Sequence, residues 1–176
     1  MAYTPDKPQK KSKIQSSEDI CVTHHGDPSH GVDVFLFQDV VDELLRTAQK
    51  ANCYGLLCGN WCLCENLEDS PREFIEITSY RDAYPMRTGF DYAALLRRNL
   101  NLTDITDAGT VLGLVMLRPT LRETTLEEVF LMRTYFNQTF HVGFVISAED
   151  ASVKCYRLSE NGQLVEIGYN IVSLKS

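Results

Sequence analysis

The stretch from Thr110 to Phe144 decides the fold, and it reads TVLGLVMLRPTLRETTLEEVFLMRTYFNQTFHVGF. It opens with the apolar run Val111–Leu117, whose length and composition predict a buried strand. The following Arg118-Pro119 ends that strand, because proline has no backbone N–H for the sheet and restricts the residue before it. A second apolar, β-rich run begins at Phe140. The stretch therefore predicts a strand, a loop, a helix and a second strand in succession.

A helix is predicted between these strands, over Thr124–Gln138. Thr124 with Glu127 three residues later has the pattern of a capping box, in which a hydroxyl and a carboxylate satisfy N–H groups at the helix start. Apolar residues then recur at helical spacing and are expected to face the core, namely Leu126, Val129, Phe130 and Phe136. The unit is therefore expected to be a helix packed on a central sheet.

The flanking sequence extends this sheet on both sides. Before the unit, the hydrophobic patterns predict strands at Val32–Phe37, Tyr54–Cys58, Trp61–Glu65 and Glu73–Tyr80, and helices at Asp39–Ala51 and Tyr92–Leu100. After it, Asn161-Gly162 between two β-rich runs predicts a hairpin, because both residues accept positive φ. The expected class is α/β in the broad sense (α+β), with a mixed, mostly antiparallel central sheet flanked by helices.

Composition limits the class of protein. A chain of 176 residues with 44% hydrophobic residues is long enough for one domain with a sizeable core. Its net charge of −7 disfavours electrostatic binding to nucleic acid or to an anionic membrane surface. No apolar run approaches the length of a membrane span, and the first residues lack the apolar segment of a signal peptide. The six cysteines are then read as reduced thiols, and we expect a cytoplasmic protein.

The chain is expected to divide into a tail and one domain. Residues 1–31 contain Pro5, Pro8 and Pro28 together with several lysines, and their few apolar residues show no period. Such a segment buries too little apolar surface to offset the entropy lost on ordering, so we predict a flexible N-terminal tail. Residues 32–176 are predicted to form a single domain.

The order of these elements resembles the JAB/MPN family, whose fold is cytidine-deaminase-like. The resemblance rests on a strand, a helix, Leu56-Leu57-Cys58-Gly59, two further strands, and then Gly113-Leu114-Val115-Met116-Leu117-Arg118-Pro119 before a helix, a strand and a hairpin. In the family, the second block reads G-x-x-H-x-H-P and is followed, after a loop, by S-x-x-D at a helix start. The resemblance covers about residues 33–172 and implies a JAB/MPN-like fold.

Active members of that family are zinc isopeptidases, and this chain departs from their ligand pattern. Two histidines at i and i+2 of a strand point to one side, and an aspartate completes three zinc ligands. The resemblance puts Met116 and Arg118 at the histidine positions, and Thr125 and Glu128 at the serine and aspartate positions. The glutamate that would take a proton from the zinc-bound water falls on Asn52. A thioether and a protonated guanidinium cannot replace two imidazoles, so we expect a pseudoenzyme with no metal or other cofactor.

The sequence leaves two arrangements of Arg118 open. Its cation could stand in for the zinc charge by pairing with Glu128. Alternatively, the side chain could point to solvent at the end of its strand. If the degenerate site binds a ligand or partner, Arg118 and Glu128 are the residues expected to contact it.

The resemblance implies a structural or adaptor subunit that acts through protein–protein interaction. Metal-free members typically pair with another such domain, so the expected partner is another JAB/MPN-like domain or a second copy of this chain. One alternative is a module that binds a peptide or ubiquitin-like tail in the degenerate cleft, with its carboxylate on Arg118. Another is a metal-dependent isopeptidase with an unusual ligand set that keeps Glu128. No nucleic-acid or membrane partner is expected.

Two other groups of residues have a composition that suits a metal. Cys58, Cys62 and Cys64 could supply three thiolates, but their spacing is not the paired C-x-x-C typical of zinc sites. We therefore interpret them as small buried hydrophobic residues. The second group is His24, His25 and His30, in a segment interpreted as a solvated loop. His141 is interpreted as a structural histidine and not as a general base.

Overall fold

The fold is described from a computed structural model, which describes residues 7–27, 31–50, 52–85, 109–120 and 124–175. These residues contain two helices, α1 (Gln38–Ala48) and α4 (Leu126–Tyr135). They also contain ten strands: β1 (Gln9–Lys11), β2 (Ile20–His25), β3 (Asp33–Phe37), β4 (Cys53–Cys64), β5 (Glu73–Pro85), β6 (Thr110–Arg118), β7 (Val142–Ser147), β8 (Ser152–Leu158), β9 (Leu164–Ile167) and β10 (Tyr169–Leu174). The helix predicted at Tyr92–Leu100 lies outside the described residues.

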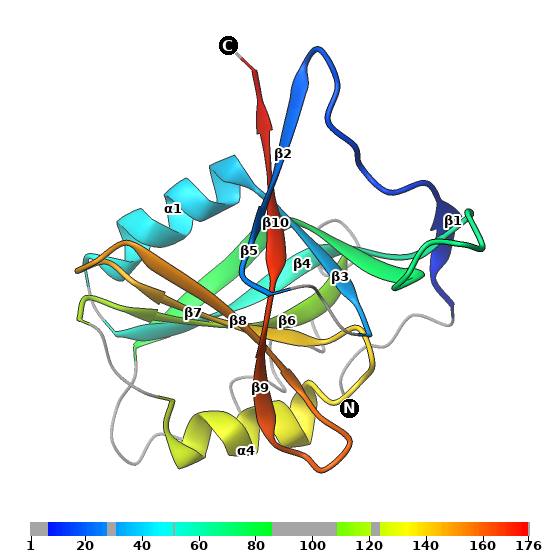
Figure 1. Cartoon of the computed structure of the whole chain (residues 1–176). Helices are drawn as coiled ribbons and strands as arrows, with labels where there is room; N and C mark the ends of the chain where they lie inside the picture. Colours follow the sequence, from blue (N-terminus) through cyan, green and yellow to red (C-terminus); the bar gives the residue numbers. More distant parts are fainter. Residues whose placement is uncertain (1–6, 28–30, 51, 86–108, 121–123, 176) are drawn as a thin grey trace.

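All ten strands belong to one curled sheet (Figure 1). Nine of them follow the order β2-β10-β3-β5-β4-β6-β7-β8-β9, and β1 pairs in parallel with the end of β4. In the described part of the chain, five pairings are antiparallel and four are parallel. The predicted class, a mixed and mostly antiparallel sheet with helices on it, is confirmed.

The predicted central unit is present as β6, α4 and β7. β6 and β7 are parallel neighbours, with registers from Gly113 opposite Val142 to Arg118 opposite Ser147. Parallel neighbours need a crossover connection, and α4 supplies it. Gly113 permits the close approach of the two strands, since a Cβ there would lie 1.9 Å from the Val142 carbonyl oxygen. The strand end that carries Arg118 is therefore held next to the crossover helix.

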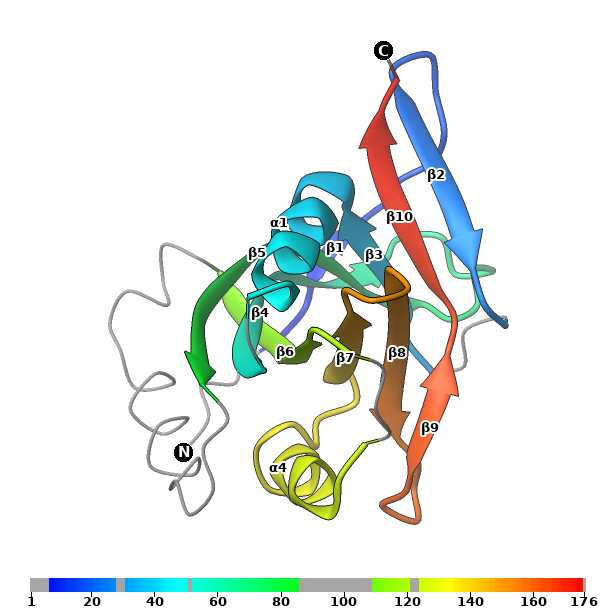
Figure 2. The same cartoon turned by 90° about the vertical axis from the view of Figure 1, so that its left-hand side faces the viewer.

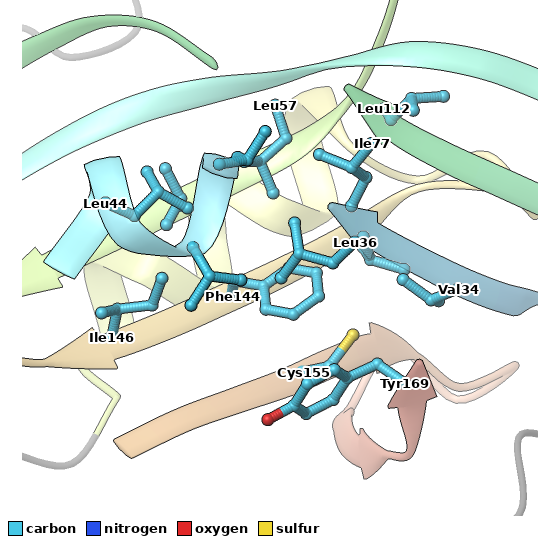
Figure 3. Packing of buried hydrophobic residues seen from close by; sticks show 14 of the residues in the cluster. Val34, Leu36, Leu44, Leu57, Ile77, Leu112, Phe144, Ile146, Cys155 and Tyr169 are labelled. Atoms are coloured by element: carbon cyan, nitrogen blue, oxygen red, sulfur yellow. The ribbon is translucent and has the colours of Figure 1, made fainter. Parts of the chain in front are cut away.

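The two helices cover opposite faces of the sheet, as Figure 2 shows. Side chains of β6 alternate between these faces: Val115 and Leu117 join the core cluster under α1, whereas Leu114 and Met116 join the cluster under α4. In Figure 3, Leu44 of α1 lies among the sheet residues of the first cluster, including Leu57, Phe144 and Ile146. By the same alternation, Arg118 faces α4.

β4 is one continuous strand, although the sequence predicted two short strands separated at Gly59-Asn60. The β4–β5 register shifts between Cys58 and Gly59, so a bulge stands where a turn was predicted. The glycine is needed for packing, because a Cβ at Gly59 would lie 1.8 Å from the Glu76 carbonyl oxygen. In the sequence, a glycine that allows another backbone to approach a strand closely looks the same as a glycine that marks a turn.

The prediction of a flexible tail over residues 1–31 needs correction, because residues 9–11 form β1 and residues 20–25 form β2. Lys11 bonds to Glu76 of β5 at 2.8 Å, and Lys13 lies 3.3 Å from Asp33 of β3. Ile14, Ile20 and Val22 pack against a third core cluster. The segment lacks local hydrophobic periodicity because its partners are distant in sequence.

The helix of the central unit begins later than predicted, at Leu126, and ends at Tyr135. Its capping box consists of Thr125 and Glu128, one residue after the predicted pair. The predicted inward face is also wrong for two residues, because Leu126 is 90% exposed and Phe130 is 57% exposed. The buried residues of this segment are Glu128, Leu131, Met132 and Phe136.

The predicted hairpin is formed by β8 and β9. The Gly162 N–H donates to the Ser159 carbonyl at 2.9 Å, and the Ser159 N–H donates to the Gln163 carbonyl at 2.8 Å. Gly162 has a φ of +74°, whereas Asn161 is not among the residues with positive φ in the described chain. The turn is thus of the type with a single left-handed glycine, and it brings the hairpin tip near the end of α4.

Candidate functional site

The residues that the family resemblance selected gather around the C-terminal end of β6. Met116 and Arg118 are two residues apart on this strand and are both fully buried on its α4 face. Met116 is part of the apolar cluster under α4. Arg118 is the largest fully buried side chain in the described chain. The alternative in which Arg118 points to solvent is therefore wrong.

Arg118 forms an ion pair with Glu128 of α4, through its Nη2 and the carboxylate oxygen Oε1. Both side chains have 0% exposure. A guanidinium and a carboxylate that are removed from water must be paired, since each alone carries a desolvation cost of several kcal/mol. The pairing that the sequence suggested is present in the structure.

The same carboxylate also begins the helix. Its second oxygen, Oε2, accepts the backbone N–H of Thr125 at 3.0 Å, and the Thr125 hydroxyl accepts the N–H of Glu128 at 3.2 Å. Glu128 therefore satisfies a helix-start N–H with one oxygen and Arg118 with the other. This arrangement fixes the carboxylate and orients the end of β6 against α4.

Asn52 is not brought into this site. It directly precedes β4, whose first residue, Cys53, pairs with Leu117 of β6. Its backbone is thus close to the end of β6, but its side chain is exposed, whereas Arg118 and Glu128 have no exposed surface. Of the five residues selected from the sequence, the structure joins Arg118, Thr125 and Glu128, and it places Met116 on the same face.

Two residues that sequence reasoning did not select stand near the pair. Ser147 is buried and pairs in register with Arg118 across β6 and β7. Tyr156 of β8 lies close enough for both charges of the pair to act on it. Burial, followed by the charge of Glu166, raises the pKa of Tyr156, and the Arg118 cation partly opposes this. Neither residue belongs to a recognisable motif, so the sequence alone does not identify them.

The donor set at this position does not suit a metal ion. A guanidinium keeps its proton and repels a cation, and the Glu128 carboxylate is already paired with it. Elsewhere in the part of the chain that the structure describes, no group of three or more His, Cys, Asp or Glu side chains could hold a metal ion.

The cysteine run behaves as buried apolar structure. Cys58, Cys62 and Cys64 are all buried in β4. Burial raises the pKa of Cys58 to about 11, and burial with the charge of Glu76 raises that of Cys62 to about 12. The Cys64 thiol donates to Asp69 at 2.9 Å. Protonated thiols such as those of Cys58 and Cys62 are poor ligands and poor nucleophiles.

The histidines have structural environments where they are described. His24 lies on β2, with Nδ1 3.0 Å from Asn170 Oδ1 and Nε2 3.1 Å from the Asp27 carbonyl oxygen. His25 stacks on Tyr169. The prediction of a solvated loop is therefore partly wrong, because His24 and His25 belong to strand β2. His30 lies outside the described residues.

No protein-family model and no curated protein matches the chain. Among solved structures, the chain is similar to the solution structure of protein DSY2949 from Desulfitobacterium hafniense, with 17% sequence identity and a TM-score of 0.47. The match covers 81% of this chain and 94% of that one.

The capping box allows a direct test of where α4 begins. We expect Thr125→Ala to lower the free energy of unfolding by about 1 kcal/mol, because a cap hydroxyl is lost. Thr124→Ala is the matched control and should change it by less than about 0.5 kcal/mol. Urea unfolding followed by circular dichroism measures both. An equal loss in the two variants would contradict the assignment of Thr125 as the cap.

Proposed function

We propose that this protein is a catalytically inactive JAB/MPN-like domain that acts as a structural or adaptor subunit through protein–protein interaction. Its partner is another JAB/MPN-like domain or a second copy of this chain. The proposal rests on the family resemblance together with the chemistry of the Arg118–Glu128 pair. It includes the expectation of a cytoplasmic protein, which the free cysteines support.

The single observation that carries this proposal is the buried ion pair. If the resemblance is right, Arg118 occupies a zinc-ligand position and brings a positive charge to the place that the metal would hold. Its partner Glu128 stands at the position of the aspartate ligand. A cation supplied by the chain itself then holds the strand end against the helix, and the domain keeps its fold while losing the chemistry.

The same pair argues against ligand binding at this position. Arg118 and Glu128 are paired with each other and have no exposed surface. A peptide carboxylate could reach Arg118 only after displacing Glu128 from both the guanidinium and the helix start. Binding of a peptide or ubiquitin-like tail in the degenerate cleft is therefore the less favoured function.

The contact surface that we favour is the outer face of α4. Leu126 and Phe130 stand four residues apart, on one side of the helix, and are largely exposed. The outer side of α1 carries polar residues instead, including Asp42, Glu43 and Arg46. Exposed apolar side chains on a helix are the usual anchors of a helical contact. Neither described helix is long and apolar enough to span a membrane.

Association in solution tests the proposal. We expect the protein to form a defined complex, with itself or with a second domain that co-purifies from its source, when measured by chromatography with light scattering. Leu126→Glu combined with Phe130→Gln should weaken this complex about tenfold or more, because apolar anchors dominate such contacts. Val165→Gln is the control, since Val165 is a half-exposed apolar residue on β9.

Two results would contradict the proposal. One is a monomer at high concentration that brings no second protein through purification. The other is one bound zinc ion per chain that survives Cys58→Ser and Cys62→Ser, with isopeptidase activity lost on chelation. The second result would favour the enzyme with an unusual ligand set.

A further inference from the structure

A cavity of about 330 Å³ lies between the end of α4 and the turn that joins β8 to β9. Its walls come from four places in the fold: the last turn of α4, the loop that follows, the end of β8, and the turn itself. This cavity is separate from the Arg118–Glu128 pair, neither of which lines it.

Two arginines line the cavity, and both lie against glycines. Arg133 of α4 donates from Nε to the carbonyl oxygen of Gly162 in the turn. A Cβ on Gly162 would lie 3.4 Å from that Nε. Arg157 of β8 lies against Gly31, where a Cβ would be only 1.7 Å from its Nη1. A Cβ at Gly162 would make only an ordinary van der Waals contact with Arg133, whereas a side chain at Gly31 would displace the guanidinium of Arg157.

The hydrogen-bond donors of Arg133 are only partly used. Its Nε bonds to Gly162, which fixes the plane of the guanidinium. In the described residues, no hydrogen bond uses its two terminal amino groups, which together carry four N–H bonds. Donors held in a fixed fork lose little conformational entropy when an oxyanion binds them.

Ser159 adds a hydroxyl donor at the turn. Its Oγ accepts the backbone N–H of Gln163 at 3.2 Å, so its own proton can be donated elsewhere. The amide side chains of Asn137 and Gln138 also line the cavity. Glu160 is the one acidic residue among the described lining residues, against two arginines. In a chain of net charge −7, this is a local excess of positive charge and of donors.

We propose that this cavity binds a phosphomonoester group. Guanidinium groups recognise phosphate through paired N–H···O bonds, and a hydroxyl donor supports a third oxygen. The cavity is larger than a phosphate alone needs, and Leu158 supplies apolar surface for the organic part of the ligand. The phosphate comes from a small metabolite or from a phosphorylated side chain of a peptide, and both present the same group to the arginines.

Binding is measured by ¹H–¹⁵N NMR at constant ionic strength, with phenyl phosphate as the probe and benzoate as the comparison anion. We expect saturable shifts of the amides of residues 137–139 and 159–162. Binding of phenyl phosphate should be about tenfold tighter than that of benzoate, since three oxygens can be bonded instead of two. Glycerol phosphate and a phosphoserine tetrapeptide are then compared. Tighter binding of the peptide assigns the site to phosphorylated chains. Equal affinity for the two probes assigns it to small phosphomonoesters.

Four variants make the test specific. Arg133→Met and Arg157→Met should each weaken binding of phenyl phosphate about tenfold, whereas the exposed Arg46→Met on α1 should leave it unchanged. Glu160→Gln should tighten binding severalfold by removing a like charge, a gain that misfolding cannot imitate. Each of three results would overturn the assignment. The NMR shifts could be spread over the surface, or benzoate could bind as tightly as phenyl phosphate. The third is that neither Arg133→Met nor Arg157→Met changes the binding of phenyl phosphate.

Discussion

Arg118→Met is expected to lower the free energy of unfolding by about 3–5 kcal/mol, the range seen when one partner of a buried ion pair is removed. The loss arises because the Glu128 carboxylate stays fully buried while its counter-charge is gone. Methionine fills much of the volume of the arginine stem, so a cavity contributes little to the effect. Chemical denaturation followed by fluorescence of Trp61, which packs against Phe140 in the core, measures the change.

A double-mutant cycle separates the pair from its surroundings. Glu128→Gln keeps an oxygen for the Thr125 N–H while removing the charge, so it leaves Arg118 buried without its counter-charge. The variant that carries both substitutions should recover at least about 2 kcal/mol relative to the sum of the single losses, because neither charge then remains. Arg46→Met, at an exposed position of α1, should change stability by less than about 0.5 kcal/mol. Strictly additive losses would show that the two side chains stabilise the fold independently.

The core of the fold could be predicted because its signals are local. The apolar run before Arg118-Pro119 gives β6, and the second run gives β7. A helix between two buried strands then has to cross over the sheet, which brings the end of the first strand to the helix start. The Arg118–Glu128 pair follows from this geometry, although the capping box is one residue later than the spacing suggested.

The N-terminal strands could not be predicted because their stabilisation is not local. Lys11 is an ordinary surface residue in sequence, but its ammonium bonds to Glu76, a carboxylate that is only 3% exposed, 65 residues away. The charge of Glu76, through this hydrogen bond, raises the pKa of Lys11. Propensity patterns contain no information about such a partner. The same limit applies to Leu126 and Phe130, whose helical spacing indicates an apolar stripe but not which side of the helix faces the core.

The cavity near the β8–β9 turn illustrates a related limit. Asn161-Gly162 predicts the turn, but nothing in the sequence relates Gly162 to Arg133, 29 residues earlier. The contact arises because β8 and β9 extend the sheet beside β7 until the hairpin tip reaches the end of α4. When the residues of a binding site come from separate elements, they can be recognised only from the three-dimensional arrangement of those elements.

Because of His141, the free energy of unfolding is expected to fall as the pH is lowered. The ring is 3% exposed and lies between Phe136 and Phe140, with centroid distances of 5.6 and 4.4 Å. Its Nδ1 accepts the N–H of Gln138 at 3.1 Å, and the ring also bonds to the backbone of Val111. A proton on Nδ1 would remove the acceptor and bury a charge. Burial therefore lowers the pKa of His141 to about 4, from an ordinary value of 6.5.

The sign of the effect follows from which state binds the proton first. Between pH 6.5 and 4 the unfolded chain protonates His141 and the folded chain does not, so stability is complete above about pH 6.5 and falls by about 3 kcal/mol as the pH approaches 4. Carboxylates titrate in the same range, so the quantity to measure is the difference in the free energy of unfolding between the wild type and His141→Gln at each pH. That difference should shrink by about 3 kcal/mol over this interval. Parallel stability curves for the two proteins would mean that the folded chain accommodates the imidazolium.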